Sequence, residues 1–277
     1  MSALSLAIGR TARTAALLAA PPEGVAPVAV QPVSRAFAPM LREGRYDLSE
    51  MAIASFLMAR AAALPVVLLP CVLAARAQEG SLLCRAGAPL RGPEDLRGAR
   101  IGVRAYSQTT GMWLRGVLAE RHGLAPAGMR WITFEEAHVA GFRDPPFCTR
   151  APAGASLEGM LREGALDAAI FGNDAPQDAA LRCVFPDPQG AAAAFRAAHG
   201  FTPVNHLLIA RREVAAARAG EIARLLAALA ASGAEVTTRA ALAPALSLAS
   251  AWCAAQGLIP RALTLDEIWA GTPDRFA

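Results

Sequence analysis

Segments with the pattern of β-strands alternate with segments with the pattern of α-helices along almost the whole chain of 277 residues. The runs 3–8, 66–73 and 204–210 are apolar and strand-like, whereas 110–122 and 212–231 are helix-like. Neighbouring parallel strands need long crossover connections, which helices usually supply. The alternation therefore predicts an α/β fold with mostly parallel sheets.

A seven-residue pattern occurs twice, 120 positions apart. Residues 41–47 read LREGRYD, and residues 161–167 read LREGALD. Each copy predicts a helix that ends at a glycine in the left-handed conformation, followed by a strand that begins at the aspartate. The repeat therefore predicts two similar lobes, each with its own sheet.

The segment 87–93 (GAPLRGP) is rich in glycine and proline, which interrupt helices and strands. We predict that the chain crosses there from a first lobe to a second. The strongly helical pattern that follows the run 204–210 predicts a return to the first lobe. On this interpretation, lobe 1 comprises residues 1–88 and 203–277, and lobe 2 comprises residues 89–202.

Every one of the 27 basic residues is arginine, and the chain has no lysine. This composition excludes a lysine Schiff base, covalently held pyridoxal phosphate and the lysine of a P-loop. The net charge is only +4, and no run of arginines is interleaved with aromatic residues. We therefore expect no nucleic-acid partner and no bound cofactor.

The location of the protein is predicted from its cysteines and apolar runs. Five scattered cysteines without a CxxC motif are typical of free thiols in a reducing compartment. The longest uncharged apolar run, 61–75, is too short to span a bilayer, so we expect no membrane insertion. The start, where arginines precede the run 15–20, is interpreted as strand, turn and helix. We predict a cytoplasmic protein, with a periplasmic location as the alternative if a signal peptide was removed.

The segment Tyr106-Ser107-Gln108-Thr109-Thr110-Gly111 follows one predicted strand and opens a predicted helix. Unpaired N–H groups at a helix start favour a bound anion by ~0.3–1 kcal/mol. A plain serine or threonine N-cap is the alternative, but the hydroxyls, amide and glycine together exceed what capping needs. We therefore expect residues 106–110 to bind a small anionic ligand.

Four further side chains are candidates for this ligand site. Arg35 and Arg104, each beside a predicted strand end, can form bidentate hydrogen bonds with a carboxylate. Glu50 interrupts an apolar stretch and can orient a ligand hydroxyl or act as an acid; a helix-start carboxylate is the alternative. Asn173 ends a predicted strand and either contacts the ligand or forms a turn before Pro176.

The histidines give no metal signal. No HxxH or HExxH spacing occurs, so we expect no metal site. His122 and His199 precede glycines at predicted helix ends and are interpreted as structural. His206 follows Asn205 on the strand that returns to the first lobe. It is either a proton donor oriented by Asn205 or a core histidine, and Asn205 itself is a further candidate for binding the ligand.

Four stretches resemble a known group of proteins, the 4,5-dihydroxyphthalate decarboxylase-like and ABC-transporter substrate-binding-protein-like proteins with the type 2 periplasmic-binding-protein fold. They are RAF (35–37) with YDLSEM (46–51), IGVRAYSQTTGMW (101–113), VFPDP (184–188) and FTPVNH (201–206). The resemblance implies two α/β lobes around an interlobe cleft. One departure is that Ala77-Gln78-Glu79 stands where the resemblance implies a histidine.

The resemblance implies cofactor-independent decarboxylation of a hydroxylated aromatic carboxylate. In this hypothesis His206 is the first choice for the general acid and Glu50 the second, while residues 107–110 bind the other carboxylate. The alternative is a non-catalytic substrate-binding protein for a small carboxylate, and a third hypothesis is an enzyme of a related biosynthetic branch. The sequence leaves homo-oligomerisation open.

Overall fold

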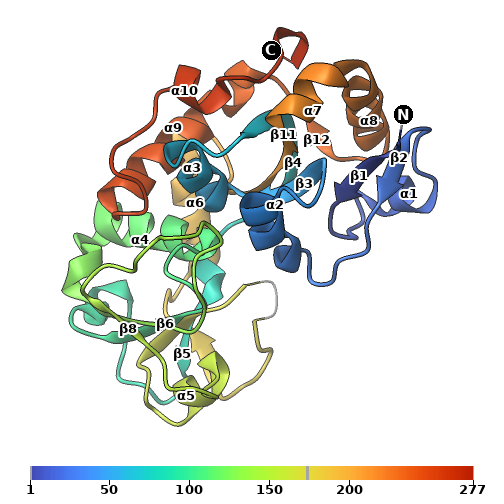
Figure 1. Ribbon diagram of the computed structural model, residues 1–277. Coiled ribbons are helices and arrows are strands. Elements are labelled where there is room, and N and C mark those ends of the chain that lie inside the picture. The colour runs from blue at the N-terminus through green and yellow to red at the C-terminus, as the bar shows by residue number, and fades with distance from the viewer. Residues whose placement is uncertain (1, 173–174, 277) are drawn as a thin grey trace.

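The computed structural model describes residues 2–172 and 175–276, which form two lobes with one mixed sheet each (Figure 1). The first sheet has the order β12 (Glu235–Val236), β4 (Val66–Ala75), β11 (Val204–Arg211), β3 (Leu48–Ala52), β1 (Leu4–Ala7) and β2 (Val25–Pro27). The second has the order β10 (Leu181–Cys183), β5 (Leu82–Arg85), β9 (Ala168–Ile170), β6 (Arg100–Val103), β7 (Arg130–Thr133) and β8 (Cys148–Arg150).

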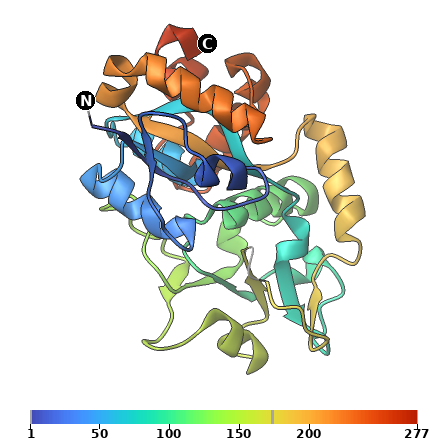
Figure 2. The same ribbon diagram turned by 90° about the vertical axis from the view of Figure 1, so that its right-hand side faces the viewer.

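Helices connect these strands and cover the sheets (Figures 1 and 2). They are α1 (Ala15–Ala19), α2 (Phe37–Glu43), α3 (Ile53–Ala61), α4 (Thr109–His122), α5 (Leu157–Arg162), α6 (Pro188–His199), α7 (Arg212–Ala217), α8 (Ala219–Ala231), α9 (Arg239–Ala255) and α10 (Leu265–Trp269). Short 3₁₀ turns lie at Val33–Ala36, Glu79–Ser81, Pro93–Leu96, Pro126–Gly128 and Asp274–Phe276. No helix within the described part of the chain is long and apolar enough to cross a bilayer.

The two sheets are less parallel than predicted. Strands β1, β2 and β3 are parallel to one another, as are β6, β7, β8 and β9. However, β5 and β11 run antiparallel to both of their neighbours. Each of them is the first strand that the chain forms after crossing to the other lobe, and it runs opposite to the parallel strands of the sheet that it joins.

The first crossing lies earlier than predicted. The prediction assigned residues 82–85 to lobe 1, but β5 pairs with β9 and β10 in the second sheet. That assignment is wrong, and the chain crosses within residues 76–81. The boundary was misplaced because the apolar pattern of β5 does not indicate which sheet the strand joins. The glycines and prolines of 87–93 form a turn inside the second lobe and not the crossing between the lobes.

The sequence repeat confirms the equivalence of the lobes. Gly44 and Gly164 both have positive φ, at 60° and 81°. Asp47 accepts a hydrogen bond from the N–H of Ser5 in β1 (2.9 Å), and Asp167 accepts one from the N–H of Arg100 in β6 (2.8 Å). Each aspartate therefore fastens its turn to the neighbouring parallel strand in the same way, and each copy of the repeat belongs to a different sheet.

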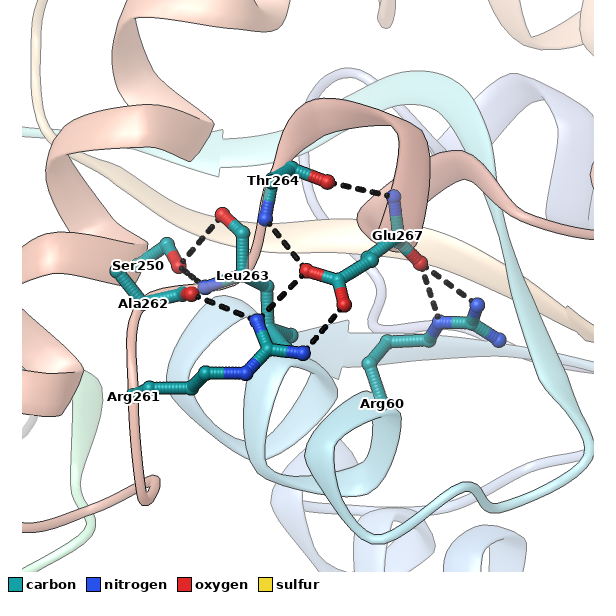
Figure 3. Close-up of polar contacts among 7 residues, drawn as sticks. All are labelled: Arg60, Ser250, Arg261, Ala262, Leu263, Thr264 and Glu267. Carbon is teal, nitrogen blue, oxygen red and sulfur yellow. Dashed lines mark hydrogen bonds and ion pairs between the residues drawn. The ribbon is translucent and has the colours of Figure 1, made fainter.

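The last helix is fixed to α3 by a polar cluster (Figure 3). Thr264 and Glu267 form a capping box at the start of α10, and Arg261 donates to both carboxylate oxygens of Glu267. Arg60 of α3 donates to the carbonyl oxygen of Glu267 (2.7 Å). These bonds join the C-terminal segment to α3 of the first lobe.

Replacing Glu267 with glutamine should make the thermal midpoint less dependent on pH. Hydrogen bonds from Arg261 and from the N–H of Thr264 lower the pKa of Glu267 from 4.5 to about 2. A depressed carboxylate pKa stabilises the fold above pH 4.5, and this stabilisation is lost as pH falls towards 2. Glutamine keeps the capping box but removes the charge. The difference in thermal midpoint between the wild-type protein and Glu267→Gln should therefore shrink as the pH falls from 4.5 to 2. Asp266→Asn, which removes a neighbouring exposed carboxylate, is the control for the loss of one negative charge.

Candidate functional site

The carboxyl ends of the parallel strands in both lobes point to the junction between the lobes. Gly9 follows β1, Glu50 lies in β3, and Arg104 follows β6. Helices α3 and α4 begin after β3 and β6, and the N–H of Ala54 in α3 donates to the side chain of Thr109 in α4 (3.3 Å). The starts of two helices from different lobes therefore meet, the usual position of ligand sites in open α/β sheets.

Glu50 and His206 form a hydrogen-bonded pair at this junction. The distance between His206 Nδ1 and Glu50 Oε1 is 2.6 Å, and Gly9 N–H donates to the other carboxylate oxygen (2.8 Å). Burial alone would raise the pKa of Glu50, but the hydrogen bond and charge of His206, with the N–H of Gly9, lower it overall. Glu50 is therefore ionised, and as acceptor it fixes the Nδ1–H orientation of the imidazole, leaving Nε2 for a ligand.

The strand register explains how this pair forms. In the antiparallel β3–β11 ladder His206 is opposite Ala52 and Leu208 is opposite Glu50, so Glu50 and His206 are diagonal neighbours on one face. On its other side, β11 shifts register against β4 at three points between Val204 and Leu208. Pro70 in β4 has no N–H for the ladder, and bulges of this kind often re-aim side chains beside functional sites.

His138 adds a second imidazole from the other lobe. Its Nδ1 lies 2.8 Å from the hydroxyl of Ser55 in α3, and burial, with the charges of Arg104 and Arg42, lowers the pKa of His138 to about 4. His138 is therefore neutral at pH 7. The rings of His138 and His206 both meet Phe37 edge-on, with centroids 5.3 Å from its own. Two imidazoles, one from each lobe, thus flank one aromatic ring.

Three of the side chains predicted at the start of α4 are buried at the junction. Ser107, Thr109 and Thr110 are each less than 5% exposed. The hydroxyl of Thr109 accepts from α3, as described above, and that of Thr110 accepts from Arg76 (3.1 Å). Gln108 takes the N-cap position without a side-chain capping bond, and its side-chain oxygen is buried without a partner among the described residues.

The backbone at the start of α4 also offers donors. The first N–H groups of a helix have no partner within it, and α4 is 14 residues long. Arg104 extends towards the first lobe, where its Nη1 lies 3.5 Å from the hydroxyl of Ser34, and it forms an ion pair with Glu135 at 3.7 Å. The junction therefore combines a helix start with a half-exposed cation.

Two other predicted site residues have different surroundings from those expected. Tyr106 is fully buried, and its hydroxyl donates to the carbonyl oxygen of Gln256 (3.1 Å), so it packs behind the helix start. Arg35 is exposed and donates to the carbonyl oxygen of Gln31 in its own turn (3.1 Å). Asn173 lies outside the described residues. Tyr106 and Arg35 are therefore not part of the cluster around His206.

Asn205 pairs with Gln78 and does not orient His206 as the sequence suggested. The two amides exchange hydrogen bonds of 2.8 and 3.3 Å, and Gln78 also donates to the carbonyl oxygen of Arg76. Gln78 belongs to the tripeptide that replaces the histidine implied by the family resemblance. The tripeptide that departs from the family pattern therefore contacts β11, the strand that carries His206. The residue that orients this histidine is Glu50.

Sequence reasoning missed Ser55, His138 and Gly9. Ser55 lies in an apolar stretch and His138 in a loop without regular pattern, and their contact joins residues 83 positions apart. The only available signal for Gly9 was its position at the end of a predicted strand. Within the described chain, no three His, Cys, Asp or Glu side chains gather to hold a metal ion.

A surface pocket of about 440 Å³ lies elsewhere, lined by residues 91–95, 122, 185–187 and 191 of the second lobe. Its histidine, His122, lies 2.7 Å from Glu94, and that carboxylate is largely exposed. The pocket contains none of the residues described above. The chemistry of the side chains therefore favours the interlobe cluster as the functional site.

Comparisons with known proteins agree with this geometry. No family model matches the chain. The chain is 30% identical to 4,5-dihydroxyphthalate decarboxylase of Pseudomonas putida over 205 residues, which cover 68% of the chain and 79% of that protein. The chain belongs to the 4,5-dihydroxyphthalate decarboxylase family. A second member, from Comamonas testosteroni, is 28% identical over 236 residues, covering 76% of the chain and 69% of that protein.

Solved structures confirm the two-lobed periplasmic-binding-protein fold expected for this family. The periplasmic aliphatic sulphonate binding protein SsuA from Escherichia coli matches 98% of the chain and 82% of its own length, with a TM-score of 0.57 and 15% identity. The alkanesulfonate-binding protein SsuA from Xanthomonas axonopodis, bound to MOPS, matches 99% of the chain and 85% of its own, with a TM-score of 0.53 and 16% identity. At this identity the similarity shows the fold alone.

Proposed function

We propose that the protein is a decarboxylase that releases CO2 from a hydroxylated aromatic carboxylate of the 4,5-dihydroxyphthalate type, without a bound cofactor. The observation that carries the proposal is the 2.6 Å pair of His206 and Glu50 at the interlobe junction, in a chain of this family. A histidine oriented by an ionised carboxylate is a common arrangement for proton transfer.

The reaction needs one proton and no external electrons. His206, in its protonated form, donates from Nε2 to the ring carbon that bears the carboxylate, and the para hydroxyl stabilises the positive charge on the ring. The bond from the ring to the carboxylate then breaks, its electron pair returns to the ring, and CO2 leaves. Glu50 stabilises the imidazolium before the transfer, and water returns the proton to His206 afterwards.

The other groups at the junction orient the substrate. The N–H groups and hydroxyls at the start of α4, from Ser107 to Thr110, suit the carboxylate that is retained. Arg104 supplies a counter-charge that is half exposed. His138 is neutral, so it suits a hydrogen bond with a ring hydroxyl, and Ser55 fixes its orientation.

We also propose a cytoplasmic location for the enzyme. All five cysteines are free thiols, and Cys71, Cys84 and Cys253 are buried. Unpaired cysteines are usual in reducing compartments. The alternative is a periplasmic protein.

A second candidate function is binding without turnover, which the fold of the SsuA proteins favours. The two functions differ in one measurement. We expect the purified protein to bind 4,5-dihydroxyphthalate and to release one CO2 per molecule converted. Phthalate is the matched control, because it has both carboxylates but no hydroxyl to stabilise the protonated ring, and it should bind without releasing CO2. Tight binding of the hydroxylated acid without CO2 release would contradict the decarboxylase and support the carrier.

A further inference from the structure

A buried arginine lies directly behind the start of α4. Arg115 is fully buried, and its guanidinium carbon lies 3.9 Å from the centre of the Tyr106 ring. Nη2 donates to the carbonyl oxygen of Tyr106 (2.6 Å), and Nε donates to the side-chain oxygen of Gln256 (2.8 Å). Arg115 therefore fixes the turn that leads into Ser107 and joins it to the residue that follows α9.

One nitrogen of this guanidinium lacks a partner. Over residues 2–172 and 175–276, Nη1 of Arg115 makes no hydrogen bond although it is buried. It lies 3.0 Å from the position that a Cβ would take on Gly111, in the first turn of α4. The glycine at this position thus allows the charged group to approach the helix start from inside the protein.

The positive charge of Arg115 has no carboxylate partner in the part of the chain that is described. The acidic side chain that acts on it is Asp144, which accepts a hydrogen bond from Thr133 and lies 3.8 Å from Arg150. A buried cation without a paired anion is strongly unfavourable, and burial accordingly lowers the pKa of Arg115. An anion bound at the adjacent helix start would offset this cost.

We propose that Arg115 is a positioning residue that makes the site prefer dianionic aromatic acids to monoanionic ones. This inference rests on the proposed function for the class of ligand. Arg115 lies behind Gly111 and acts without touching the ligand, through the Tyr106 turn and through its full charge, which adds to the partial charge of the helix start. Two unit charges ~10 Å apart in a protein interact strongly enough to change a dissociation constant on the order of tenfold.

The test compares the binding of phthalate and benzoate by calorimetry, at a pH at which phthalate is a dianion. Neither acid has the hydroxyl that decarboxylation needs, so binding is measured without turnover. The wild-type protein should bind phthalate more tightly than benzoate by on the order of tenfold or more. Arg115→Met removes the charge at similar volume, and it should bring the two dissociation constants to within about threefold of each other.

Two further variants separate charge from packing. Gln256→Glu retains Arg115 and supplies the missing counter-charge beside Nε, so it should also abolish the preference for phthalate. Arg115→Lys retains a charge but cannot make both hydrogen bonds, so it should weaken the binding of both acids and keep the preference. The thermal midpoint of each variant reports whether it folds, and either charge-neutralising variant suffices if the other is unstable.

The outcomes are distinct. Equal loss of affinity for both acids in Arg115→Met and Gln256→Glu would overturn the inference, because a purely structural residue acts on both alike. A wild-type protein that does not discriminate between the acids, or that binds neither, would overturn it as well. A failure of the wild-type protein to release CO2 from hydroxylated acids would contradict the decarboxylase while leaving the binding ratio intact.

Discussion

Replacing His206 with alanine should leave the binding of 4,5-dihydroxyphthalate nearly unchanged and lower the rate of CO2 release by ~10²–10⁴-fold. A proton donor stabilises the transition state more than the bound ground state, so its loss reduces kcat and not affinity. Single-turnover CO2 release and calorimetry on the same preparation measure the two quantities. His199→Ala is the matched control: that histidine, at the end of α6, pairs with Glu120 and packs against Phe195, so its loss should not affect turnover.

The partner of His206 gives a second test of the same step. Glu50→Gln removes the charge that orients and stabilises the imidazolium, so it should also lower turnover. Because the two residues act as one unit, the double variant should be about as slow as His206→Ala alone. If His206 is only a core residue, His206→Ala will lower the thermal midpoint and leave the specific activity of the folded fraction intact, which would contradict its catalytic role.

Local patterns in the sequence predicted much of the fold. The two copies of LREG predicted helices that end at Gly44 and Gly164, because only a glycine readily adopts positive φ there. The hydroxyl-rich segment predicted the start of α4 to within one residue. Glu50 was recognised as a candidate because a carboxylate inside an apolar strand is rare, and it is indeed buried.

Features that depend on contacts between distant residues could not be predicted. Which sheet β5 joins depends on its pairing with β9 and β10, which lie far along the chain. The pattern at 212–231 predicted one helix, but the chain breaks at Arg218, between α7 and α8. Only the C-terminal end of α6 was predicted, where His199 precedes a glycine, although Asp187 caps the start of this helix and Pro188 begins it.

The candidate site shows the same limit. Tyr106 was grouped with Ser107 by sequence adjacency, yet it faces the opposite way, towards Arg115 and Gln256. His138 has no local signal, because its role depends on a serine from the other lobe. A pattern of residue types identifies the element that carries a site, whereas the direction of each side chain depends on what packs behind that element.

Replacing Gly116 with alanine should destabilise the protein by about 1–3 kcal/mol or more. Gly116 lies in α4, and a Cβ there would be 1.8 Å from a ring carbon of Trp252 in α9. The indole is rigid and packs against Trp113 and Phe195, so it cannot simply move aside. The better helix propensity of alanine, about 1 kcal/mol, opposes this clash but does not cancel it. Urea unfolding measures the difference.

Because α9 also packs against α3, the same contact joins α4 to the first lobe. The glycine therefore helps to set how the two helix starts meet, and Gly116→Ala should also weaken ligand binding. Gly220→Ala is the matched control: this glycine is in α8, a Cβ there would lie 4.0 Å from the flexible end of Arg275, and the change should be close to neutral. In a protein that already carries Trp252→Ala, Gly116→Ala should cost less stability than it does in the wild-type protein, because the ring that causes the clash is gone. A Gly116→Ala protein as stable as the wild type would show that α4 and α9 can move apart without cost. It would contradict the role of this contact in fixing the position of the lobes.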